Sequence, residues 1–121
     1  MTSLSIFIIL IAAVALGGAN LWLRFRGVRK PVLIGIHLLA GLASLEVLVY
    51  YLKDVNGGEG MPAGPFGNVA AALLGLAAFS GLISPILGRR SKLTADMLVG
   101  THVSCGLLGA VTAIAWVTSR M

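Results

Sequence analysis

The sequence predicts an all-α integral membrane protein, an up-down-up-down four-helix bundle forming a single domain over residues 1–121. Composition is the first reason: the 121 residues are 58% hydrophobic and 11% charged, and the mean hydropathy is +0.99. Charged residues make up about a quarter of an ordinary soluble domain. The second reason is that the apolar residues form four runs, each long enough to cross a hydrocarbon core about 30 Å thick.

Polar and turn-forming residues separate the four runs. Gly27 should break the first helix, and Pro31 suits the first turn of the second. The stretch 53–65 is rich in Gly and Pro, which is typical of a loop. Gly88 should end the third helix, and Thr94 is the expected N-cap of the fourth. We therefore expect helices over residues 4–23, 31–52, 66–87 and 95–118.

Basic residues predict how the helices are oriented. Seven of the nine Lys and Arg residues lie in the two short turns, at positions 24, 26, 29, 30, 89, 90 and 92. Such turns face the cytoplasm, which places both termini of this multi-pass chain outside it. We expect the protein in a bacterial plasma membrane. The positive charge then marks topology, so the expected partner is the lipid bilayer and not nucleic acid.

One pattern occurs twice, 65 residues apart. Gly-x-His-x-x-x-Gly-Leu occupies residues 35–42 and again 100–107, and it contains the only two histidines, His37 and His102. Two copies of a helix pair in one orientation predict a pseudo-twofold axis along the membrane normal. The second and fourth helices of an up-down bundle are diagonal neighbours. The histidines should therefore face each other, about 10 Å from the cytoplasmic end of their helices at 1.5 Å per residue.

Glycines on the first and third helices should lie at the same depth in the membrane as the two histidines. Two opposed imidazoles with small side chains around them are what a planar macrocycle held edge-on in a bundle requires. We therefore expect one b-type haem, with His37 and His102 as its metal ligands. Its propionates should lie near the basic turns, including Arg24 and Arg89. The glycines expected to make room for the haem are Gly17, Gly18, Gly41, Gly81 and Gly106.

This arrangement resembles the membrane cytochromes b, whose diagonal helices supply the axial histidines while glycines on the other two helices make room for the ring. The resemblance covers the whole four-helix unit and lies in its architecture. It implies an electron carrier, or a subunit of a quinone-linked oxidoreductase, with quinone or a larger redox complex as its partner. Two-haem members carry a second histidine on each ligand helix, where this sequence has Tyr50, Tyr51, Ala115 and Trp116. Only one haem would have ligands.

Glu46 is the remaining ionisable candidate, because it lies within the second apolar run. A bare carboxylate there would cost several kcal/mol, so we expect it to be protonated or hydrogen-bonded. One hypothesis makes it a proton relay for quinol oxidation. The other makes it a structural acid bonded to Ser44, Thr112 or a backbone carbonyl.

Two other functions remain open from the sequence. One is a cofactor-free accessory or assembly subunit of a membrane complex, in which the glycines serve only helix packing. The other is a small proton-coupled transporter that uses Glu46. No motif for hydrolysis or nucleotide binding is present, so no catalytic residue is predicted.

Overall fold

The computed structural model describes residues 3–57 and 64–120, and within these ranges the chain forms α-helices and no strand. The helices are α1 (Ser3–Phe25), α2 (Pro31–Gly57), α3 (Gly64–Leu87) and α4 (Lys92–Thr118). All four are long and apolar enough to cross a membrane. The prediction of an all-helical chain with four helices of membrane-spanning length is confirmed.

Two helix ends lie three or more residues from the predicted ones. Helix α2 continues past residue 52 to Gly57, because residues 53–56 contain neither Gly nor Pro to stop it. Helix α4 begins at Lys92, and its N-cap is Ser91, whose side-chain oxygen accepts the backbone N–H of Thr94 at 3.0 Å. The prediction of Thr94 as the cap was therefore wrong, since Thr94 is the donor to that cap. Residues 58–63 of the predicted loop lie outside the described residues, and residues 64 and 65 belong to the first turn of α3.

Gly27 ends α1 as predicted. Its φ of 71° is in the left-handed region, which glycine adopts at little cost. The N–H of Val28 donates to the Leu23 carbonyl at 2.9 Å, and the N–H of Gly27 donates to the Arg24 carbonyl at 3.0 Å. This pair of bonds is a Schellman motif, and it satisfies carbonyls that the helix end would leave without partners.

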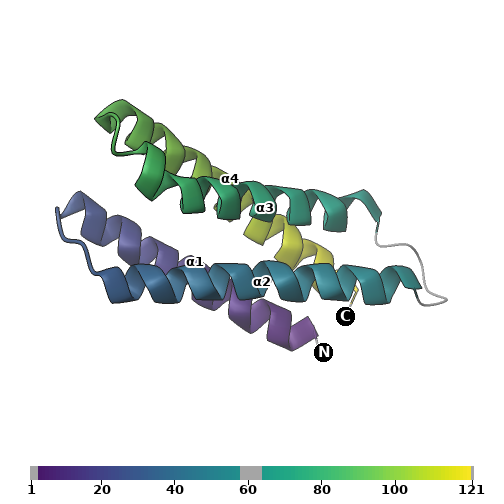
Figure 1. Ribbon diagram of the computed structural model, residues 1–121. Coiled ribbons are helices and arrows are strands. Elements are labelled where there is room, and N and C mark those ends of the chain that lie inside the picture. Colours follow the sequence, from purple (N-terminus) through teal and green to yellow (C-terminus); the bar gives the residue numbers. More distant parts are fainter. Residues whose placement is uncertain (1–2, 58–63, 121) are drawn as a thin grey trace.

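The helices form two hairpins, α1 with α2 and α3 with α4 (Figure 1). Contacts within each hairpin are more extensive than those between α2 and α3 or between α1 and α4. The chain termini lie at one end of the molecule, and the two short turns lie at the other (Figure 1).

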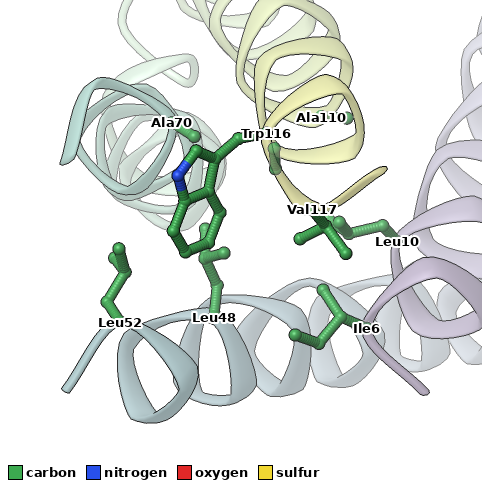
Figure 2. Packing of buried hydrophobic residues seen from close by; sticks show 9 residues of the cluster. Ile6, Leu10, Leu48, Leu52, Ala70, Ala110, Trp116 and Val117 are labelled. Atoms are coloured by element: carbon green, nitrogen blue, oxygen red, sulfur yellow. The ribbon is translucent and has the colours of Figure 1, made fainter. Parts of the chain in front are cut away.

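The packed core lies in the half of the molecule that holds the termini. Trp116 of α4 projects toward Leu48 and Leu52 of α2 and lies beside Ala70 of α3 (Figure 2). Its ring also meets Tyr51 edge-on, with ring centroids 5.6 Å apart. All four helices contribute to the buried cluster, which comprises Ile6, Leu10, Leu48, Leu52, Ala70, Ala110, Ala113, Trp116 and Val117.

Large apolar side chains also cover the outside of the molecule. Val32 is 75% exposed, Leu39 69% and Phe79 62%. Water would not solvate so many apolar groups favourably, whereas lipid tails would. This surface is compatible with a lipid bilayer.

Two glycines of α3 provide a matched test of the core packing. A Cβ at Gly67 would lie 2.6 Å from Leu52 Cδ2 and 3.0 Å from Trp116 Cε2, whereas a Cβ at Gly75 would meet nothing within 4 Å. Gly67→Val should therefore lower the free energy of unfolding by about 1–3 kcal/mol, the usual cost of overpacking a core. Gly75→Val should leave it nearly unchanged. Unfolding in mixed detergent micelles measures both, and equal destabilisation by the two variants would contradict the described packing.

Candidate functional site

The structure brings the two histidines together from different hairpins. His37 lies on α2 and His102 lies on α4, and their Nε2 atoms are 3.5 Å apart. The ring centroids are separated by 5.7 Å and the ring planes are almost perpendicular, at 89°. Both side chains are partly buried. Two residues 65 positions apart thus present the same ring nitrogen to each other.

Each imidazole is held from behind by a backbone carbonyl of the preceding helix. His37 Nδ1 lies 3.0 Å from the Ala13 carbonyl oxygen of α1, and His102 Nδ1 lies 2.7 Å from the Ala77 carbonyl oxygen of α3. A carbonyl oxygen can only accept, so each Nδ1 must carry the proton and donate it. Bonds of this kind orient histidines that ligate metals.

Gly17 and Gly81 make these carbonyl contacts possible. Each lies four residues after the carbonyl concerned, directly above it on the helix surface. A Cβ at Gly17 would lie 2.9 Å from His37 Cε1, and one at Gly81 would lie 2.8 Å from His102 Nδ1. Because glycine has no Cβ, each ring can lie against the helix and reach the second lone pair of the carbonyl. The two glycines thus make room for the imidazoles themselves.

The other predicted glycines are not in contact with the rings. A Cβ at Gly18 or at Gly41 would meet nothing within 4 Å, and one at Gly106 would meet only the Ala77 Cβ, at 3.7 Å. Ala13 and Ala77 also belong to the site, because their backbone carbonyls contact the two rings. Their alanine side chains gave no reason to predict this from the sequence. Only the small-xxx-small spacing from Ala13 to Gly17 and from Ala77 to Gly81 could have pointed to them.

The two facing Nε2 atoms create an electrostatic requirement. With the proton on each Nδ1, the Nε2 atom of a neutral imidazole is an acceptor. Two acceptor lone pairs 3.5 Å apart repel each other unless a positive centre lies between them. That centre is either an extra proton on one ring or a metal ion. A cation on the line between His37 and His102 would remove this repulsion.

A cleft with polar side chains at its mouth lies between α1 and α4, and neither histidine is among the residues that line it. Its volume is about 830 Å³, and it extends along α4 from Lys92 and Asp96 to Val103 and Ser104, beside His102 in the chain. Helix α1 and the turn after it contribute Leu21, Arg24, Phe25, Gly27 and Arg29 to the lining. The wall deeper in the cleft is apolar, which suits an amphipathic ligand with its charged end at the turns.

Asp96 organises the basic residues at the mouth of the cleft. Its carboxylate accepts from Arg24 Nη2 at 2.9 Å and from Lys92 Nζ at 2.7 Å. The Arg24 pair joins α1 to α4, and therefore one hairpin to the other. Arg89, by contrast, is exposed on its turn and is not part of the cleft wall. Asp96 was not among the site residues predicted from the sequence, although an acidic residue one turn into a helix that follows a basic turn could have indicated it.

The number of protein donors limits which cation fits. The described residues contain no cluster of three or more His, Cys, Asp or Glu side chains that could hold a metal ion. A closed zinc site takes four protein ligands, so two imidazoles alone do not make one. Metal to imidazole bonds of about 2.0 Å place opposed ligand nitrogens about 4 Å apart. The observed 3.5 Å is within half an ångström of that separation, and a metal held by this pair would have to bring its remaining ligands with it.

Comparisons with protein-family models, with curated proteins and with solved structures found no match to this chain. The geometry and chemistry of the site are therefore the basis for assigning a function.

Proposed function

We propose that this chain is a membrane electron-transfer protein that binds one b-type haem between His37 and His102. The observation that carries the proposal is the pair of Nε2 atoms facing each other at 3.5 Å, each on a ring whose Nδ1 lies against a carbonyl oxygen. A haem iron would take four nitrogens from its macrocycle, so the protein would have to supply only two ligands. The two histidines match that number.

Membrane insertion is the first part of the proposal. The four helices have the length and hydropathy of membrane spans, and large apolar side chains cover their outer surface. We place the two basic turns in the cytoplasm because seven of the nine Lys and Arg residues lie there. The helices then form an up-down-up-down bundle in the plasma membrane, with the haem toward the cytoplasmic side.

The sequence repeat supports a site to which each half of the chain supplies one imidazole. Ala13 and Gly17 of α1 surround His37 as Ala77 and Gly81 of α3 surround His102. The halves of the chain therefore supply one imidazole each in matching surroundings, as a parallel repeat about an axis along the membrane normal would.

Several residues of the chain have defined roles in this proposal. The carbonyls of Ala13 and Ala77 hold the rings so that both Nε2 atoms point inward, and they increase the basicity of those atoms. Arg29 would offer a cation to the propionates at the mouth of the cleft, beside Arg24 and Lys92, which are also paired with Asp96. When bound, the haem supplies one-electron chemistry. One haem on one side of the membrane requires a second carrier, and quinone or a larger redox complex is the proposed partner.

Glu46 gives no support to the transporter alternative. Its side chain is exposed on the outside of α2, whereas a coupling carboxylate lines a water-filled path inside the protein. The exposed position of Glu46 also gives no specific support to a proton relay between Glu46 and the haem, because His37 lies between the helices and Glu46 lies outside them.

An absorption spectrum tests the proposal. The full chain, expressed with ample haem and purified in mild detergent, should carry one haem per chain and show a Soret band that shifts when dithionite reduces it. The haem content is measured after extraction into alkaline pyridine. A folded chain that stays colourless under these conditions would contradict the proposal and would favour a cofactor-free accessory subunit.

A further inference from the structure

Glu46 occupies an unusual place on the surface of the molecule. It is exposed and lies near the middle of the apolar span of α2, Pro31–Asp54. Both ion pairs found among the described residues involve Asp96, so Glu46 has no cationic partner in that part of the chain. Ser44 and Thr112, two expected partners, instead donate to backbone carbonyls of their own helices.

A carboxyl in this position would face lipid in an isolated chain. Ionisable side chains within membrane segments are rare, and they almost always face protein or a water-filled cavity, where a partner compensates for lost hydration. Glu46 also lies too far from either end of its apolar span for its short side chain to reach the headgroups, since even the nearer end, Asp54, is eight residues away and thus about 12 Å along the axis. A cationic partner for this carboxyl would therefore have to come from beyond the described residues of this chain.

The face of α2 around Glu46 has the features of a helix-binding surface. At about 100° per residue, Leu39, Leu42, Val49 and Lys53 all point within about 60° of Glu46, and all four are exposed. Together with Glu46 they follow the alternating three- and four-residue spacing of a helix-packing seam. We call these five residues the α2 outer face.

Gly35 extends the α2 outer face by one more position in the same spacing. A Cβ at Gly35 would meet nothing within 4 Å, so packing within the described chain does not require a glycine there. A small residue at such a position lets the backbone of a second helix come close. The apolar seam, the small residue and the carboxyl without a partner thus lie on one side of α2.

We infer that the α2 outer face binds a transmembrane helix of another protein, and that this helix presents a Lys, Arg or His side chain to Glu46. A second copy of the chain would not present a cation to Glu46. Two copies inserted in the same orientation carry Glu46 at the same depth, so a symmetric contact through α2 would oppose two carboxyls without a cation. The inference rests on the membrane insertion proposed above and is independent of haem binding.

A model peptide tests this surface directly. The full chain, with a donor dye at its C-terminus, is placed in phosphatidylcholine vesicles with an acceptor-labelled Leu/Ala transmembrane peptide that has one Lys at the depth of Glu46. Energy transfer should show association about 5- to 30-fold tighter than with a peptide that has Leu in place of Lys. This is the range expected from an interhelical hydrogen bond of about 1–2 kcal/mol. Glu46→Leu should remove the preference.

A relocated carboxyl provides the matched control. Val111 is the repeat-related position of α4 and is 65% exposed. The double variant Glu46→Leu/Val111→Glu keeps a lipid-facing carboxyl but takes it off the α2 outer face. It should bind the Lys peptide more weakly than the wild type. Equal binding by this variant, or equal binding of both peptides to the wild type, would overturn the inference.

Self-association is measured in the same vesicles. Copies labelled with donor and with acceptor should show no energy transfer that depends on Glu46, and a Glu46-dependent dimer would overturn the inference in favour of a second copy. The absorbance of each sample at the Soret band reports haem content separately. A colourless chain that prefers the Lys peptide would contradict the proposed haem and leave the inference about α2 standing.

Discussion

His37→Ala and His102→Ala should each abolish stable haem binding. Either change removes one of the two nitrogens that face each other at 3.5 Å, and no third imidazole exists in the sequence to replace it. Loss of a hydrogen-bond partner behind a metal ligand typically costs 10- to 100-fold in affinity, so loss of the ligand should cost more than about 100-fold. The measurement is haem content per purified chain, with the Soret band recorded in the oxidised and the reduced states.

Three companion variants separate ligation from folding. Thr112→Val changes α4 at an exposed residue whose hydroxyl donates only within its own helix, and it should retain one haem per chain. His37→Gly and His102→Gly should recover haem when free imidazole is added, because imidazole can replace the missing ring. Full haem content in either alanine variant would rule out ligation by that residue.

Gly17→Ala and Gly81→Ala should weaken haem binding by about 10- to 100-fold, as expected when the support behind a ligand is lost. The new Cβ would lie 2.9 Å from His37 Cε1 in the first case and 2.8 Å from His102 Nδ1 in the second. Carbon atoms in ordinary contact are about 3.5–4.0 Å apart, so the imidazole must move. This displacement breaks its bond to the carbonyl one turn earlier. Haem titration of the apoprotein measures the affinity.

Gly18→Ala is the matched control for Gly17→Ala. The two glycines are adjacent on α1, but a Cβ at Gly18 would meet nothing within 4 Å. Alanine also favours helix over glycine by about 1 kcal/mol in a helix interior. Gly18→Ala should therefore keep its haem affinity within about twofold while Gly17→Ala loses it. If the two variants behaved alike, the contact between Gly17 and the His37 ring would not be needed for the site.

The candidate site was partly predictable because the chain repeats. His37 and His102 occupy equivalent frames of the same eight-residue pattern, so any symmetric packing of the two helix pairs would relate them. That Gly17 and Gly81 lie at the depth of the two histidines also follows from counting residues along straight helices. Residue counting does not show which of Gly17 and Gly18 faces His37. Adjacent residues point about 100° apart around the helix, so the rotation of α1 in the packed chain decides which one contacts the ring.

The sequence by itself determined the number of helices, their apolar character and the matched positions of the two histidines. Hydropathy, Gly and Pro act through neighbouring residues, so these features can be read without knowing how the helices pack. Only the tertiary structure decided that the Ala13 and Ala77 carbonyls hold the rings, that Asp96 joins Arg24 across the hairpins, and that Glu46 points outward. Backbone oxygens carry no residue-specific signal, and the direction in which a helical side chain points depends on the rotation of its helix within the packed chain.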